Sequence, residues 1–173
     1  MTMLSFDRYK EIYALLDPVG PAPYDCGTLC GSICCSSAAF DGEDPYIYLL
    51  PGEKEYLEAC GSRMPVVRQR RDEHDLPVSW GQYVYIAHCR GKEMCDRHLR
   101  PIQCRTFPLQ PSISKSGELG LVLCRADVPY HCPFLDGSLT VSDDFKSAVF
   151  RAWQLLIEDE AIRDLVVSDS EDC

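Results

Sequence analysis

The chain has 173 residues and a mass of 19.5 kDa, a size typical of one folded domain. Hydrophobic residues make up 46% and charged residues 25%, which excludes a disordered or collagen-like chain. The net charge of -10 repels the phosphates of nucleic acids and of anionic lipids. We therefore expect a single domain, residues 1–173, that binds neither nucleic acid nor membranes.

The apolar segments are too short for a membrane span. No apolar run approaches the ~20 residues that a span needs. Asp7, Lys10 and Glu11 stand where a secretory signal would have an uninterrupted apolar segment. We expect a cytoplasmic protein.

The first third of the chain predicts two helices and one strand. Residues 5–16 have apolar side chains at helical spacing, and Ser5 can cap this helix. Residues 18–25 contain three prolines and a glycine, so we expect no regular structure there. A short strand is expected at 46–50, and a helix at 51–60 begins with a proline in its first turn.

Further along the chain, short strands are expected between cysteines. Residues 62–79 carry a mixed charge run that is interpreted as a solvated loop. Residues 82–89 alternate aromatic and β-branched side chains and predict a strand that ends on Cys89. Residues 107–124 predict a hairpin that turns at 114–117.

The clearest predicted helix is the last. Its apolar stripe continues to Leu156, and Thr140 or Ser142 can cap it. The closing segment 168–173 is acidic, and we expect a frayed tail. The predicted fold class is α+β: a small domain with cysteine-rich loops, short strands and a long C-terminal helix around a metal–thiolate centre.

Eleven of the 173 residues are cysteine. This fraction is below the ~8–10% of a short secreted disulfide scaffold. Disulfides do not persist in a reducing compartment, so clustered thiols there are better explained as metal ligands. A disulfide-bonded protein is the last of the interpretations that we consider.

The first cysteine cluster contains a tandem repeat. In residues 26–35, the tetrad Cys-Gly-hydroxyl-aliphatic occurs twice before two adjacent cysteines. A helix would place Cys26, Cys30 and Cys34 on one face, and a loop could wrap backbone N–H groups around the thiolates. Either geometry would bring the sulfur atoms of these cysteines close together. Adjacent Cys34 and Cys35 are expected to point in different directions, which favours two metal centres or one ligand beside one packing residue.

The later cysteines have irregular spacing. No two cysteines in the chain are separated by two residues, which argues against zinc ribbons, thioredoxin-type motifs and c-type haem. A zinc ion or a [4Fe–4S] cluster takes four thiolates, so nine candidates suffice for two sites or for one site with spares. The nine are Cys26, Cys30, Cys34, Cys35, Cys89, Cys95, Cys104, Cys124 and Cys132. Cys60 and Cys173 are interpreted as incidental. His88 and His131 each precede a cysteine and could substitute as ligands, but they are interpreted as surface residues.

Two arginines flank Cys104. Arg100 and Arg105 can offset the negative charge of clustered thiolates and donate to carbonyl groups of the turn. The alternative role is to bind an anionic substrate beside the metal.

Residues 100–108 read Arg-Pro-Ile-Gln-Cys-Arg-Thr-Phe-Pro. With the first cluster and the pair Cys89 and Cys95, this segment resembles the bacterial YkgJ family, described as a zinc- or iron-chelating domain. The likeness spans about 26–132, but the gaps in the first cluster are three residues where the family has two. A related domain in flagellin lysine methylases carries an iron–sulfur cluster, so the resemblance implies an iron–sulfur cluster or zinc.

The expected function is therefore metal binding, with an iron–sulfur cluster or zinc in a structural or redox role. The alternative is a metal-dependent redox or group-transfer enzyme that acts on a protein partner. No hydrolase triad, zinc-protease motif or phosphate-binding loop stands out in the sequence, and no substrate is indicated.

Overall fold

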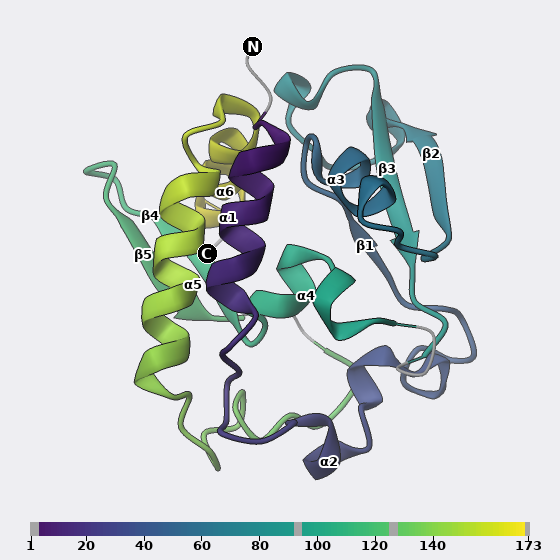
Figure 1. Ribbon diagram of the computed structural model, residues 1–173, viewed down its shortest axis with the longest axis vertical. Coiled ribbons are helices and arrows are strands. Elements are labelled where there is room, and N and C mark those ends of the chain that lie inside the picture. The colour runs from purple at the N-terminus through teal and green to yellow at the C-terminus, as the bar shows by residue number, and fades with distance from the viewer. Residues whose placement is uncertain (1–3, 92–94, 125–127, 172–173) are drawn as a thin grey trace.

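Three helices and a hairpin form one side of the molecule (Figure 1). The computed structural model describes residues 4–91, 95–124 and 128–171. Helix α1 (Phe6–Leu16) packs against α5 (Asp143–Leu156), and α6 (Glu160–Glu171) packs against β4. Strands β4 (Leu109–Ile113) and β5 (Leu119–Leu123) form an antiparallel pair. The hairpin predicted at 107–124 is confirmed.

A three-stranded antiparallel sheet forms the other side (Figure 1). Its strands are β1 (Tyr46–Tyr48), β2 (Val66–Arg70) and β3 (Tyr83–His88), in the order β1-β3-β2. Helix α3 (Glu53–Ala59) lies on this side, and the short helix α4 (Ile102–Thr106) lies between the two halves. The predicted α+β class is confirmed, as are the strands expected at 46–50 and 82–89.

One apolar core joins the helices to the sheet. Its most buried members come from α1, α5 and α6, with contributions from α3 and the chain before it, from β3 and from α4. They include Tyr9, Ile12, Leu50, Ile102, Phe145, Val149, Leu156 and Ile162. No cysteine among the described residues belongs to the buried core, so the thiols lie beside it.

The predicted helix starts depend on serine caps, which the structure confirms. The Arg8 N–H donates to Ser5 Oγ at the start of α1. The Phe145 N–H donates to Ser142 Oγ at the start of α5. Of the two caps proposed for the last predicted helix, Ser142 is the one used. A serine oxygen at this position satisfies a backbone N–H that has no partner within the helix.

The interpretation of 62–79 as a loop is wrong for its first part. Residues Val66–Arg70 form β2, which pairs with β3 from Val66↔Ala87 to Arg70↔Tyr83. The strand is at the edge of the sheet, and Arg68 and Arg70 are exposed there. Charged side chains are common on edge strands because they discourage pairing with other chains. The first residues of the charge run therefore belong to an edge strand, which the charge pattern alone did not predict.

The frayed acidic tail is also a wrong prediction within the described residues, because α6 continues through 168–171. An apolar stripe anchors α6 in the core, and Asp159 Oδ1 accepts from the N–H groups of Ala161 and Ile162 at its start. Near its end, Ser170 Oγ accepts from the Ile113 N–H at 2.9 Å. No helix in the described part of the chain is long and apolar enough to cross a membrane.

The packing of α6 gives a stability prediction. Ile162 is fully buried, and its neighbour Arg163 is exposed. We expect Ile162→Ala to lower the free energy of unfolding by about 2–5 kcal/mol, because it leaves a cavity in the core. Arg163→Ala should change it by less than about 0.5 kcal/mol. Urea denaturation measures both values, and equal losses would show that α6 is not docked as described.

Candidate functional site

One cavity of about 420 Å³ collects six of the nine candidate cysteines. The six are Cys34, Cys35, Cys89, Cys95, Cys104 and Cys124. The first two lie in a 3-10 turn (Ile33–Cys35), the third follows β3, the fifth lies in α4 and the last follows β5. Segments far apart in the sequence thus bring their sulfur atoms to one place.

The other walls of this cavity are mainly apolar and aromatic. Phe40, Tyr46, Met64, Phe107 and Tyr130 border it, with no carboxylate among the described lining residues. Soft thiolate ligands select zinc, copper(I) or iron–sulfur clusters, whereas hard cations need oxygen ligands. The donor set therefore suits a soft metal or a cluster.

Arg100 supplies the one permanent charge among the described residues that line this cavity. Its Nε atom is buried and has no hydrogen-bond partner. The groups of opposite charge that interact with it are the thiols of Cys95, Cys35 and Cys104 in their ionised form. A partly buried guanidinium without a carboxylate partner is costly, and thiolates or a bound anionic cluster would relieve that cost.

The first cysteine cluster is neither one helix nor a simple loop. A single helical turn, α2 (Gly27–Cys30), ends at Gly31 and Ser32, which both have left-handed backbone conformations (φ 66° and 58°). A Cβ atom on Gly27 would lie 2.3 Å from Ser32 Oγ, so a larger residue at this position would require the Ser32 side chain to move. The chain then enters the 3-10 turn that carries Cys34 and Cys35.

The two adjacent cysteines diverge only in part. Cys34 Sγ and Cys35 Sγ are 3.9 Å apart, and both side chains border the large cavity. Cys34 also borders a smaller pocket that Cys35 does not reach, so the two side chains share one cavity and the predicted divergence is found only in part.

Three thiols of this cavity, those of Cys35, Cys89 and Cys104, have raised pKa values, whereas the hydrogen bond with Cys35 lowers the pKa of Cys34. The interaction with Cys34 raises the pKa of Cys35 to about 11. Burial raises the pKa of Cys104, because many protein atoms surround its thiol. The residue is nevertheless exposed to solvent on the side of the cavity. The Cys89 thiol donates to the Cys35 carbonyl oxygen at 3.8 Å. A metal must displace these protons to bind, so binding should release protons.

Helix α4, which carries Cys104, is held by the buried carboxylate of Glu53. Its Oε1 atom accepts from the Ile102 N–H at 2.7 Å and from the Tyr13 hydroxyl at 2.9 Å. Its Oε2 atom accepts from the Leu50 N–H at 2.9 Å. Burial raises the pKa of Glu53. One side chain thus joins α1, α3 and α4.

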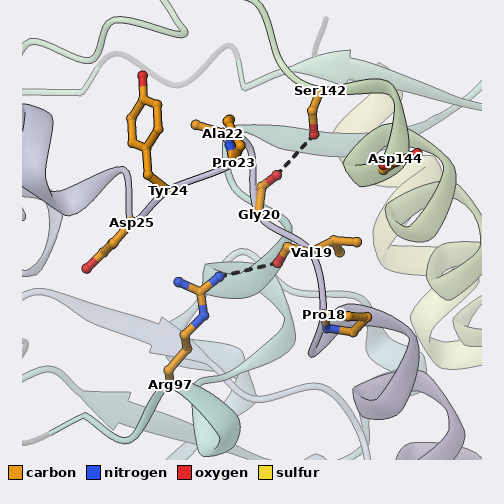
Figure 2. Close-up of a pocket in the computed structure, with 10 residues that line it drawn as sticks. All are labelled: Pro18, Val19, Gly20, Ala22, Pro23, Tyr24, Asp25, Arg97, Ser142 and Asp144. Atoms are coloured by element: carbon orange, nitrogen blue, oxygen red, sulfur yellow. Dashed lines mark hydrogen bonds between the residues drawn. The ribbon is translucent and has the colours of Figure 1, made fainter.

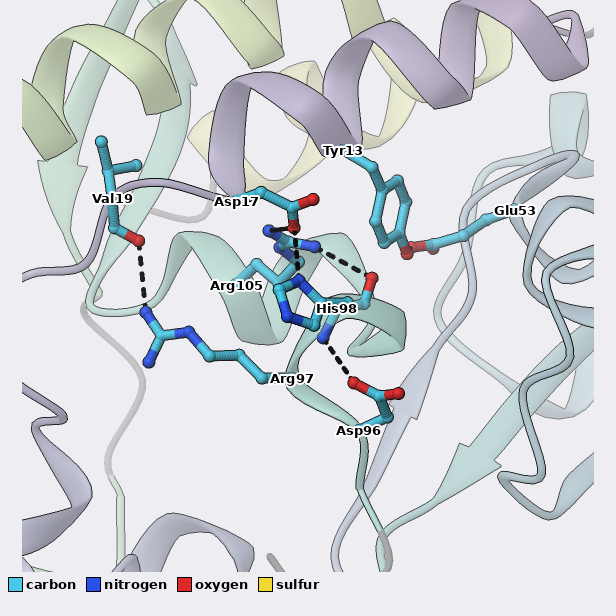
Figure 3. A network of polar contacts seen from close by, with 8 residues as sticks. All are labelled: Tyr13, Asp17, Val19, Glu53, Asp96, Arg97, His98 and Arg105. Carbon is cyan, nitrogen blue, oxygen red and sulfur yellow. Dashed lines mark hydrogen bonds and ion pairs between the residues drawn. The ribbon is translucent and has the colours of Figure 1, made fainter.

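Arg105 faces α1 and does not line the cavity (Figure 3). Its Nη2 atom lies 2.5 Å from Asp17 Oδ1, and its Nη1 donates to the His98 carbonyl oxygen at 3.1 Å. The guanidinium lies 5.0 Å from the centre of the Tyr13 ring. Of the two flanking arginines, Arg100 lies at the thiols and Arg105 connects α4 to the end of α1.

The irregular segment 18–25 leads the chain to Cys26 and is held by three hydrogen bonds. Figure 2 shows two of them, from Ser142 Oγ to the Gly20 carbonyl at 3.1 Å and from Arg97 Nη2 to the Val19 carbonyl at 3.3 Å. The Ser142 N–H also donates to the Pro21 carbonyl. The open pocket of about 370 Å³ in this region has no cysteine in its lining.

The remaining candidate cysteines lie elsewhere. Cys26, Cys30 and Cys132 border a second, smaller pocket. Cys60 is exposed at the end of α3 and lines neither cysteine pocket, and Cys173 lies outside the described residues.

The two histidines that precede cysteines have other neighbours. His131 Nε2 forms an ion pair with Asp136, and the ring of His88 lies 6.1 Å from that of Tyr46.

The sulfur atoms are gathered, but they are not arranged as a finished ligand shell. In the part of the chain that the structure describes, no group of three or more His, Cys, Asp or Glu side chains could hold a metal ion as it stands. All ten described cysteines are free thiols. The residues therefore fit a metal by donor chemistry and by location, and a metal would have to draw the sulfur atoms together.

Comparison with protein-family models, with curated proteins and with solved structures gives no significant match for this chain. The likeness to the YkgJ family stays a prediction that rests on the residues of the motif at 100–108.

The anchoring of α4 can be tested through Glu53. We expect Glu53→Ala to lower the free energy of unfolding by about 3 kcal/mol or more. It removes the acceptor of three buried donors, each of which costs about 1–3 kcal/mol when left unpaired. Glu55→Ala, an exposed position in the same helix, should cost less than about 0.5 kcal/mol. Chemical denaturation of both variants measures these free energies of unfolding. A small loss of stability in Glu53→Ala would contradict the anchoring role of Glu53.

Proposed function

We propose that this chain is a cysteine-rich metal-binding protein whose thiolates hold an iron–sulfur cluster, or zinc, in the large cavity. The observation that carries the proposal is the convergence of six cysteines from separate segments on one cavity without a carboxylate in its described lining. Six cysteines exceed the four ligands of a zinc ion or a [4Fe–4S] cluster. The expected role is structural or redox, in a cytoplasmic compartment that keeps the thiols reduced.

The charge of the site supports the same proposal. Thiolates add negative charge to a chain that already carries a net charge of -10. Arg100 is placed to offset that charge, since its guanidinium faces the cavity and interacts with three of the thiols. Hydrogen bonds from charged donors to anionic sulfur are also the means by which proteins adjust the potential of a cluster.

The size of the cavity favours a cluster over a single zinc ion. About 420 Å³ is far more than one ion with Zn–S bonds of ~2.3 Å fills. The apolar side chains around the sulfur atoms would limit the access of water, which is a further determinant of cluster potential. With enough thiolates to occupy every coordination position, we expect no hydrolytic activity.

One observation favours the alternative of a redox or group-transfer enzyme that acts on a protein partner. The cavity is open at its rim, where Tyr46 is 58% exposed and Cys104 is also exposed. An open rim would let a partner or a substrate approach the metal, with Arg100 beside it. In that case a coordination position would be free or shared with solvent.

Metal analysis after purification without oxygen tests the proposal. We expect at least one equivalent of iron plus zinc per chain, with a brown colour that bleaches in air if the metal is an iron–sulfur cluster. Cys104→Ser should lower metal content and thermal stability together, because binding free energy contributes to folding. Cys60→Ser is the matched control and should change neither.

Two results would contradict the proposal. Wild-type protein with less than one equivalent of iron plus zinc would end it. Full metal occupancy in Cys104→Ser would show that Cys104 is not a required ligand, which contradicts the assignment at the most specific position of the motif.

A further inference from the structure

The three candidate cysteines outside the large cavity meet a fourth at a separate pocket. Cys26, Cys30, Cys34 and Cys132 border this pocket, whose volume is about 30 Å³. Its other lining residues are mostly apolar, among them Leu29, and no carboxylate is found among the described residues that line it. Four cysteine residues thus line a space smaller than a tenth of the large cavity, and a metal would have to draw their sulfur atoms together, because they do not form a finished ligand group in the described chain.

A wall of three side chains separates the two spaces. Cys34, Phe107 and Tyr130 border both of them. Of these two spaces, Cys35 borders the large cavity and not the small pocket, although it is adjacent to Cys34 in the sequence. The first cysteine cluster is therefore divided between two places.

We propose that the small pocket is a second metal centre, at which Cys26, Cys30, Cys34 and Cys132 hold a single zinc ion in a closed tetrahedral site. The inference rests on the proposed function, since it assumes that the thiols serve as metal ligands. Five cysteines then remain for the occupant of the large cavity. These are Cys35, Cys89, Cys95, Cys104 and Cys124.

The volume of the small pocket selects a single ion. About 30 Å³ is roughly the space of one water molecule in the liquid. A single ion can occupy such a space once the four cysteine side chains in its wall draw in to Zn–S distances of ~2.3 Å, whereas an iron–sulfur cluster would have to force the walls apart. A structural zinc site is closed by four protein ligands, and the pocket offers four thiols.

The backbone brings these thiols together from two parts of the chain. Cys26 and Cys30 are four residues apart at the two ends of α2, so both side chains lie on the same side of one helical turn. The Cys30 thiol lies 3.9 Å from the Cys26 carbonyl oxygen. Cys132 begins a tight turn, because its carbonyl accepts from the N–H groups of Leu135 and Asp136. The thiols of Cys30 and Cys132 both lie close enough to Cys26 to interact with it.

Cys34 is the best fourth ligand, although His131 also borders the pocket. The His131 Nε2 atom is already paired with Asp136, and the His131 side chain is 74% exposed. Cys34 faces the pocket from the shared wall, and its thiol interacts with both Cys30 and Cys26. The set of four sulfur ligands therefore needs no change in the partners of His131.

Paired variants of the full chain, purified without oxygen, test whether the cysteines are divided between two metal centres. We expect the wild type to contain one equivalent of zinc in addition to the occupant of the large cavity. Cys132→Ser should lose that zinc and keep the iron–sulfur absorption, whereas Cys104→Ser should lose the absorption and keep one zinc. If zinc also fills the large cavity, each variant should lose one of two equivalents. Cys60→Ser should lose neither metal.

A wild-type measurement keeps the test independent of whether the variants fold. X-ray absorption at the zinc edge should show four sulfur neighbours at ~2.3 Å and no iron neighbour. The two-centre proposal would be overturned, and the proposed function left standing, by an iron or nitrogen neighbour of the zinc. Loss of both metals together in a variant with native circular dichroism would have the same consequence. Wild-type protein without metal would overturn both.

Discussion

The buried carboxylate of Glu53 is the contact on which the arrangement of the candidate site depends. It accepts hydrogen bonds from α1 through Tyr13, from the chain before α3 through Leu50, and from the first residue of α4 through Ile102. Burying a carboxyl group is unfavourable unless it accepts hydrogen bonds. These three elements must therefore stay together to keep Glu53 fully hydrogen-bonded. A second bond, from Gln103 Nε2 to the Tyr48 carbonyl, ties α4 to the sheet.

This anchoring explains what each residue of the segment 100–108 does. Arg100 and Cys104 face the large cavity, whereas Arg105 reaches Asp17 at the end of α1. Pro101 precedes the first turn of α4, where a missing N–H costs nothing. The motif therefore combines two tasks, one at the thiols and one in the scaffold that holds them.

The scaffold and the cysteine segments differ in what stabilises them. The helices α1, α5 and α6 share a continuous apolar core, which forms without any thiol. Residues 26–39 contain only short turns and no residue of that core other than the partly buried Cys26 at its edge. Metal ligation would supply the ordering energy that this segment does not obtain from packing.

The elements with strong local signals were predictable from the sequence. Ser5 and Ser142 cap helices whose apolar spacing is regular, and the alternation at 82–89 gives β3. Strand β2 was missed because its arginines suit an exposed sheet edge as well as a loop. Helix α6 was missed because its apolar residues are followed by acidic ones.

The division of the cysteines depends on contacts between distant segments, which no local pattern reveals. Cys89 reaches the Cys35 carbonyl because the Cys89 N–H pairs with the Pro45 carbonyl beside β1. Similarly, Cys124 reaches the cavity because its N–H pairs with the Pro108 carbonyl across the hairpin. Such pairings depend on the tertiary fold, so spacing alone gave the set of candidate ligands and not their partition.

Amide hydrogen exchange before and after metal removal tests most directly whether the metal orders the cysteine segments on a scaffold that stands without it. The account predicts that anaerobic treatment with a chelator sharply reduces the protection of amides in residues 27–35, while α1 and α5 keep theirs. Unchanged protection in residues 27–35 after complete loss of metal would contradict it, as would an equal loss of protection in α1 and α5.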